Sequence, residues 1–195
     1  MLSLYVITLG EAGLRCDSEA LHLRWEDVDL EDGFLWISSS REGHRTKSGK
    51  GRWVPMTPRL HKAMRDHFAR FRFATYDGQR TPYVFHHVTT RRRAKAGQRI
   101  GVLRRAFEGA VSRAKLPADL HQHDLRHRRV TTWLAAGGDA VKVKEAMGHA
   151  DLRTTMDYTH LVRDNLRSLV EPVGRSGEGL TGKDAKPREV AGVAS

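Results

Sequence analysis

Apolar residues recur at helical spacing in several separate parts of the chain. Near the N-terminus this spacing predicts a helix that ends within Gly10 to Gly13, and its apolar positions are Leu2, Tyr5, Val6 and Leu9. A short helix with Ser18 as its N-cap is predicted to end near Trp25. Five further helices are predicted, one beginning at Pro58, one at about Leu103, and three over Leu125 to Ala136, Ala140 to Met147 and Leu152 to Leu161.

Two short segments have the composition of β-strands. Phe34 to Ile37 follows a turn signal, and Arg52 to Met56 comes after a polar stretch from Ser38 to Gly51. This arrangement predicts an antiparallel hairpin with a basic distal half. Tyr83 to Phe85 is predicted to be a short, buried, extended segment. The pattern therefore predicts an α+β fold that is mainly helical, with a small antiparallel β-hairpin or sheet.

The net charge of the chain indicates what kind of partner it binds. The chain has 34 Lys and Arg against 23 Asp and Glu, a formal net charge of +11. Such an excess indicates a polyanionic partner, most often nucleic acid. The positive residues concentrate on the hairpin and in residues 89–99, and we expect both segments to contact DNA phosphates through Arg41, Arg45, Lys50, Arg91, Arg92, Arg93, Lys95 and Arg99.

Length and composition bound the organisation of the chain. Its 195 residues are 39% hydrophobic, enough for one domain with a buried core. The single cysteine, Cys16, excludes an intramolecular disulfide and a multi-cysteine zinc site, and it is typical of a reducing cytoplasm. No apolar stretch approaches the roughly 20 residues of a membrane span. Residues 171–195 lack periodicity and are predicted to form a disordered tail after a folded domain over 1–170.

The residues with the clearest chemistry lie in the C-terminal half. His123-Asp124-Leu125-Arg126-His127 is followed by Gly148-His149, and Tyr158 comes nine residues after His149. Attack on a phosphodiester requires an oxygen nucleophile, stabilisation of the non-bridging oxygens and a proton for the departing alkoxide. Guanidinium groups match two phosphate oxygens, so Arg126, with Arg15 far upstream, is suited to the stabilising role. The set indicates phosphoryl transfer on nucleic acid with Tyr158 as the nucleophile.

Proton transfer needs further groups. Tyrosine has an ordinary pKa near 10 and is a poor nucleophile until it is deprotonated. His123 and His149 are the candidates to accept its proton or to hold a phosphate oxygen. Lys47, in the predicted hairpin, is the candidate general acid for the leaving 5′ oxygen.

These motifs resemble the catalytic domain of the tyrosine recombinases, the phage integrase family. The first family box matches as Gly13-Leu14-Arg15 followed by Glu19 to Trp25, and the hairpin lysine matches within Thr46 to Lys50. The second box matches as His123 to His127, then Gly148-His149 and Tyr158. The resemblance covers about residues 2 to 170.

The resemblance implies a role for each matched residue. Arg15 and Arg126 bind the scissile phosphate, and Lys47 protonates the 5′ oxygen. His123 and His149 assist proton transfer and phosphate binding, with Glu19 supporting the site. Tyr158 forms a 3′-phosphotyrosyl bond that conserves bond energy, so neither ATP nor a metal cofactor is implied. The implied partner is double-stranded DNA, bound by a homo-tetramer of the full-length protein. The implied setting is the cytoplasm of a bacterium, near the nucleoid, with the protein encoded by the bacterium or a phage.

Two features depart from the family pattern. The spacing from Arg15 to Glu19 is one residue longer than usual, which weakens the assignment of Glu19. Only 14 residues precede Arg15, too few for the family's N-terminal DNA-binding domain. We therefore expect an N-terminally truncated catalytic domain, for which a catalytically weak or inactive basic DNA-binding fragment is the alternative.

Two other classes of enzyme fit part of the pattern. A metal hydrolase is suggested by His121, His123 and His127, but Arg126 stands where such a loop needs an aspartate, and a cation beside a metal is unfavourable. A type IB topoisomerase shares the tyrosine chemistry and differs in its partner and assembly.

Overall fold

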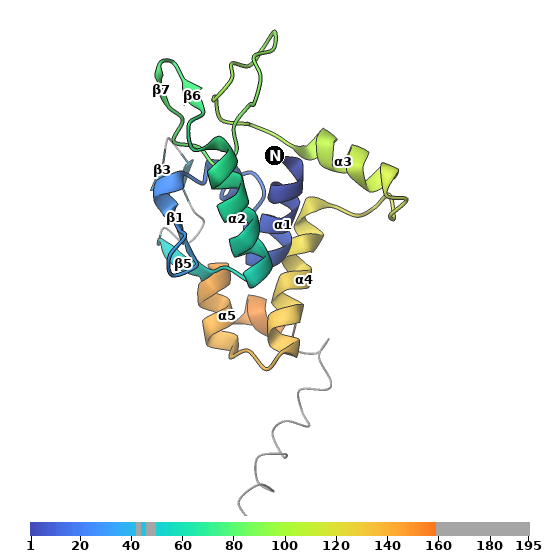
Figure 1. The fold of residues 1–195 in the computed structure, drawn as a ribbon. Coiled ribbons are helices and arrows are strands. Elements are labelled where there is room, and N and C mark those ends of the chain that lie inside the picture. The colour runs from blue at the N-terminus through green and yellow to red at the C-terminus, as the bar shows by residue number, and fades with distance from the viewer. Residues whose placement is uncertain (42–43, 46–49, 159–195) are drawn as a thin grey trace, which may run out of the picture.

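The computed structural model describes residues 1–41, 44–45 and 50–158 (Figure 1). Its helices are α1 (Leu2–Ala12), α2 (Pro58–Phe71), α3 (Arg104–Arg113), α4 (Gln122–Ala135), α5 (Ala140–Met147) and α6 (Arg153–Met156), with 3-10 turns at Ala20–His22 and Trp25–Asp27. Its strands are β1 (Val28–Asp29), β2 (Phe34–Ile37), β3 (Ser40–Arg41), β4 (His44–Arg45), β5 (Arg52–Pro55), β6 (Thr75–Tyr76) and β7 (Gln79–Arg80). The predicted α+β class, mainly helical with a small antiparallel sheet, is confirmed.

Helix α1 lies at the centre of the molecule, between α2 and α4 (Figure 1). Tyr5 and Leu9 are fully buried in the main core. The helix continues through Gly10 and ends at Gly13, whose left-handed conformation (φ 64°) lets its amide bond to the Leu9 carbonyl. A glycine inside a helix costs about 1 kcal/mol, and the packing of α1 on both neighbours offsets that cost. The helix therefore ends at the last of the predicted glycines.

The segment after α1 differs from the sequence prediction. An α-helix capped by Ser18 is not formed, and two 3-10 turns take its place. Glu19 precedes the first turn, and its buried carboxylate bonds to the Arg15 side chain and backbone amide. This contact bends the chain back toward Arg15, so a continuous helix cannot start at Ser18.

The predicted hairpin is confirmed as the pairing of β2 with β5. The strands are antiparallel, with Leu35 opposite Val54 and Ile37 opposite Arg52, and β1 adds a short third strand. Leu35, Ile37 and Val54 face the core, as alternation along the strands requires. Arg52 faces inward too, so a cation occupies a core position of this sheet.

Helix α2 begins at Pro58, as the sequence predicts. Thr57 is its N-cap and accepts a hydrogen bond from the Leu60 amide at 3.3 Å, and Pro58 follows at the first helical position. Leu60, Met64 and His67 are buried against the rest of the molecule.

Helices α4 and α5 form a second, smaller core. Val130 and Leu134 of α4 pack with Val143 and Met147 of α5. Helix α4 begins three residues before the predicted Leu125, because Asp124 accepts a hydrogen bond from the His121 amide at 2.7 Å and caps an earlier turn. Helix α5 matches its prediction. The last predicted helix spans Leu152 to Leu161. Within it the structure has the short helix α6 over Arg153–Met156, and residues 159–161 lie outside the described residues.

Residues 83–100 follow α2 and the small β6–β7 hairpin. Val84 and Phe85 are buried, as predicted for this extended segment. The chain then forms a loop whose two sides meet through a bridge between His86 and Arg99. None of the helices in the described part of the chain combines the length and apolar content needed to cross a bilayer.

The buried histidines His67 and His86 make stability depend on pH. Burial lowers the pKa of His67 to about 4 and also lowers the pKa of His86. Unfolded histidine titrates near 6.5, so the unfolded chain binds more protons than the folded chain between about pH 6.5 and 4. The free energy of unfolding should therefore fall as the pH falls through this window, by about 2 kcal/mol from pH 7 to pH 5 for His67 alone.

Urea unfolding of His67→Gln measures this contribution. Glutamine keeps a donor for the Val84 carbonyl, which His67 contacts at 3.0 Å, but it does not titrate. The variant should lose about 2 kcal/mol less than the wild type between pH 7 and pH 5. Equal losses in both proteins would show that His67 does not make the difference.

Candidate functional site

Glu19 is the buried acidic centre of the site. Its Oε1 accepts from Arg15 Nη1 at 2.5 Å and from Arg52 Nη1 at 3.0 Å. Its Oε2 accepts from the Arg15 amide at 2.9 Å and from Arg52 Nη2 at 2.8 Å. Burial opposes ionisation of Glu19, but the hydrogen bonds and charges of Arg52 and Arg15 outweigh it and lower the pKa of this carboxyl. Glu19 is therefore a carboxylate at neutral pH, despite the longer spacing from Arg15.

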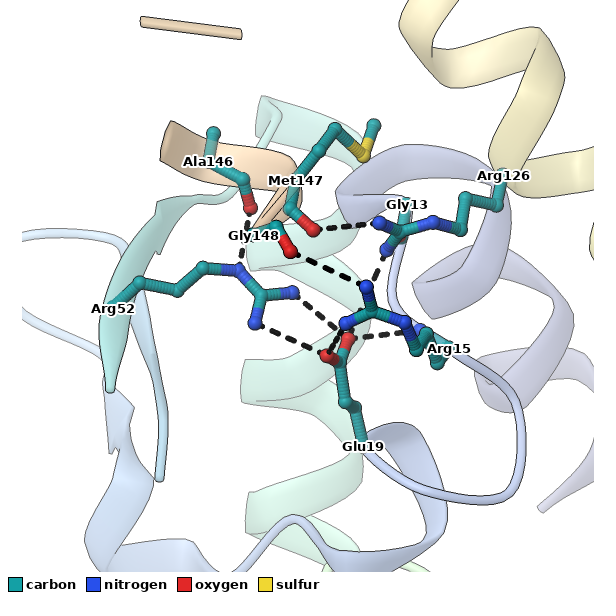
Figure 2. A network of polar contacts seen from close by, with 8 residues as sticks. All are labelled: Gly13, Arg15, Glu19, Arg52, Arg126, Ala146, Met147 and Gly148. Atoms are coloured by element: carbon teal, nitrogen blue, oxygen red, sulfur yellow. Dashed lines mark hydrogen bonds and ion pairs between the residues drawn. The ribbon is translucent and has the colours of Figure 1, made fainter. Parts of the chain in front are cut away.

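Three arginines from different parts of the chain meet at the carboxyl end of α5 (Figure 2). Each donates to one of three consecutive carbonyls: Arg52 Nε to Ala146 at 2.8 Å, Arg126 Nη2 to Met147 at 2.6 Å and Arg15 Nη2 to Gly148 at 3.2 Å. The last carbonyls of a helix have no partner within it and lie at the negative end of its dipole. The end of α5 is thus a docking point for cations.

Arg126 is the most deeply buried of the three. Its Nη1 donates to the Gly13 carbonyl at 2.5 Å, and the same nitrogen lies 3.8 Å from Glu19 Oε2. Burial lowers the pKa of Arg126 to about 10, against the opposing effect of Glu19. The group remains a cation at neutral pH. It joins the end of α1 to α4 and α5.

The three guanidiniums differ in how far solvent reaches them. The side chain of Arg15 is 24% exposed, against 8% for Arg52 and 4% for Arg126. Three positive charges and one carboxylate leave a net charge of +2 at the cluster. A guanidinium has five N–H donors, so Arg15 and Arg126 retain donors beyond the bonds described above. The arrangement suits an oxyanion such as phosphate, approached from the side of Arg15.

Gly148 and His149 follow directly after α5. Gly148 has φ 63°, and a Cβ at this position would lie 2.8 Å from Arg52 Nη1, so both conformation and space require glycine. His149 Nδ1 lies 2.9 Å from Thr155 Oγ1. Burial, with the nearby guanidiniums, lowers the pKa of His149 to about 4. The ring is therefore neutral at neutral pH and can donate one hydrogen bond.

Tyr158 contacts a histidine that the sequence prediction does not include. His123 and His149 are the predicted partners of its hydroxyl, but the hydrogen bond joins Tyr158 Oη to Nδ1 of His127. His123 packs edge-on against the His127 ring, with centroids 4.4 Å apart. Burial raises the pKa of Tyr158, Arg126 opposes this shift and Asp157 adds to it. The phenol is therefore protonated at neutral pH, with an imidazole beside it.

An open hollow of about 730 Å³ adjoins His149. Its lining combines two lysines and an exposed tryptophan with the residues around the end of α5, and consists of Lys50, Gly51, Arg52, Trp53, Lys144, Glu145, Gly148, His149 and Ala150. The space next to the arginine cluster is large enough for part of a nucleic-acid strand.

The remaining predicted site residues lie elsewhere or outside the described structure. Lys47 is outside the described residues, and Arg41 and Arg45 are described only as backbone of β3 and β4. On the 89–99 loop, Arg91, Arg92, Arg93 and Lys95 are exposed and Arg99 is half-buried. In the described ranges, no three His, Cys, Asp or Glu side chains are grouped as metal ligands would be.

Two residues that make contacts in this site, Arg52 and His127, are not among the site residues predicted from the sequence. Arg52 belongs to the predicted strand, and its signal is a charged residue at a position where alternation requires an apolar one. His127 is part of the matched box, and its signal is its position four residues after His123, on the same face of α4.

Comparisons with known proteins show which family this chain resembles in sequence and fold. A family model described as the phage integrase family matches residues 3–164. The tyrosine recombinase XerA of Pyrococcus furiosus is 32% identical over 168 residues, covering 86% of this chain and 53% of that protein. The chain spans about half the length of the curated relatives it matches.

Two solved structures share the fold. A crystal structure of XerA recombinase aligns with a TM-score of 0.66 and 26% identity, over 90% of this chain and 59% of that chain. The Tn1549 transposon integrase, in complex with transposon right-end DNA, aligns with a TM-score of 0.67 and 21% identity, over 87% of this chain and 58% of that chain. The family model over residues 3–164 and the 32% identity to XerA show that the chain belongs to the phage integrase family of tyrosine recombinases.

Proposed function

We propose that this chain is the catalytic domain of a site-specific DNA recombinase. The observation that supports this most is the joining of Arg15, Arg126 and Glu19 at the end of α5, with His149 next to them. A net positive, partly exposed cluster of this kind suits a phosphodiester. Solved structures with the same fold include a transposon integrase bound to transposon DNA.

The proposed reaction begins with phosphate binding. Arg15 and Arg126 donate to the non-bridging oxygens, where negative charge develops in the transition state. His149, neutral at neutral pH, donates a hydrogen bond to the same phosphate. The positive charge of Arg126 opposes the effect of burial on Tyr158 and favours loss of the phenol proton.

Tyr158 then attacks the phosphorus atom. Its proton passes to His127 Nδ1, the imidazole nitrogen that the hydroxyl already contacts. The bond from phosphorus to the 5′ oxygen breaks, and Lys47 gives this oxygen a proton. The products are a 3′-phosphotyrosyl bond and a free 5′ hydroxyl. Since the phosphodiester energy is retained, a 5′ hydroxyl of a partner strand reverses the steps and joins the strands.

The assembly is part of the proposal. We expect the partner to be double-stranded DNA, bound by a homo-tetramer of the full-length protein at the bacterial nucleoid. Exposed Arg91, Arg92 and Arg93 on the 89–99 loop are suited to phosphate contacts outside the site.

The covalent step has a direct test. Nicked duplexes of randomised sequence, in which the short cut strand diffuses away, should trap a covalent adduct with the wild type. Tyr158→Phe removes the nucleophilic oxygen and should form no adduct, whereas Tyr76→Phe, on β6, should behave as the wild type. Separation of protein from labelled DNA under denaturing conditions measures the result. DNA binding without an adduct in the wild type would instead identify a DNA-binding fragment without catalysis.

Arg15→Ala should slow adduct formation by about 10²-fold, since removal of one donor to a developing oxyanion costs about 3 kcal/mol. The matched control is Arg59→Ala, an arginine on α2 that pairs with Glu11. The rate constant at saturating DNA is the quantity to compare. An unchanged rate in Arg15→Ala would exclude this residue as a phosphate ligand.

Removal of charge from the 89–99 loop should change the salt dependence of DNA binding. Log affinity falls with log salt by about 0.9 per phosphate neutralised. Replacing Arg91, Arg92 and Arg93 together with glutamine should therefore reduce this slope by about 3 units. The control removes the same charge from α2 by replacing Arg59, Lys62 and Arg65. Equal changes of slope in both variants would contradict a specific contact by the loop.

A further inference from the structure

We infer that Arg52 is a positioning residue of this site, holding Glu19 and the end of α5 so that Arg15 and His149 face the phosphate. The inference rests on the proposed function for its chemistry and on the described contacts for its geometry. Arg15 and Arg126 are the two arginines that match the family boxes. Arg52 adds a third guanidinium, which is buried in the protein.

The place of Arg52 in the fold is unusual for a cation. It is the first residue of β5, opposite Ile37 of β2, and points to the core side of the sheet, as Val54 does. Removing a charge from water costs several kcal/mol unless it is well paired. A strand that only had to pack would have an apolar residue here.

The guanidinium of Arg52 is bonded on every nitrogen within the protein. The side chain is 8% exposed. Nε donates to the Ala146 carbonyl, while Nη1 and Nη2 donate to the two oxygens of Glu19. We therefore expect Arg52 to act on a bound phosphate through Glu19 and the end of α5.

The first route runs through Glu19. Arg52 bonds to both carboxylate oxygens, and such a bidentate pair sets the plane of the carboxylate as well as its position. Glu19 in turn bonds to the Arg15 guanidinium and to the Arg15 amide. Arg15 is the most exposed of the three arginines, so its orientation depends on this one carboxylate more than on packing.

The second route runs through the end of α5. The bond to Ala146 ties β5 to the last turn of the helix, and the guanidinium lies directly against Gly148. Arg52 therefore supports the turn from which His149 projects. The same strand begins five residues after Lys47 in the sequence, so this bond also holds the described end of the hairpin against the site.

The test compares the buried Arg52–Glu19 pair with the partly buried Arg129–Glu11 pair. Arg52→Gln removes the proposed positioning contacts. Arg129→Gln removes the pair with Glu11 and a bond of 2.7 Å to the Gly10 carbonyl, outside the proposed phosphate site. Both variants should unfold at lower urea concentration than the wild type. At a temperature where both are folded, Arg52→Gln should form the adduct about 10²-fold more slowly at saturating DNA, and Arg129→Gln near the wild-type rate. Equal slowing in both would overturn the inference.

A double-mutant cycle tests the route through Glu19. If Arg52 acts by orienting this carboxylate, Arg52→Gln should slow adduct formation far less in a Glu19→Gln background than in the wild type. Arg52→Lys should restore little of the rate, because one ammonium cannot bond to both carboxylate oxygens and the Ala146 carbonyl in the same geometry. Full additivity of the two substitutions would exclude the route.

A measurement without DNA separates this inference from the proposed reaction. In the free protein, the Nε–Hε signal of Arg15 in nitrogen-15 NMR reports the order of its guanidinium. This signal should lose order in Arg52→Gln and remain as in the wild type in Arg129→Gln. If the wild type forms no adduct, the proposed function fails, and the order of Arg15 alone decides the positioning role. An ordered Arg15 in Arg52→Gln would overturn it.

Discussion

The pairing of one buried carboxylate and one helix end with three guanidiniums organises this molecule. Glu19 and the last carbonyls of α5 are strong acceptors in a place that water barely reaches. Each would be costly to bury alone, and the arginines would be equally costly. Together they satisfy one another, and they join α1, β5, α4 and α5 at a single point (Figure 2).

Within this pairing, one arginine is enclosed by the protein and another is open to solvent. Arg52 is almost entirely enclosed, whereas Arg15 keeps a quarter of its side chain exposed. A phosphate bound to Arg15 would therefore meet a guanidinium already oriented from behind by Glu19. Less rearrangement is then needed when the ligand arrives, which is the physical basis of electrostatic preorganisation.

Tyr158, the proposed nucleophile, is held by a different type of contact. Tyr158 bonds to His127, and His127 packs against His123 one helical turn earlier. Both histidines belong to α4, which also positions Arg126. One helix therefore carries both Arg126, the proposed phosphate ligand, and His127, the partner of the tyrosine.

Much of the fold follows from local sequence. Pro58 begins α2, and the apolar run from Phe34 to Ile37 forms the strand that its composition predicts. The segment after Ser18 does not follow its local preference, because the Glu19 carboxylate bonds to Arg15 and Arg52. Propensity is a weak constraint, and a buried ion pair outweighs it.

The sequence by itself determined the residue types of the site and their family, through boxes that each lie within a short segment. It also predicted that Arg15, Arg126, His149 and Tyr158 form one site. Only the tertiary structure decided which partner each one has. Arg52 is 33 residues from Glu19 and 94 from Ala146, and such contacts depend on how strands and helices pack. Spacing along the chain predicts neighbours on one element, whereas partners on different elements are set by the fold.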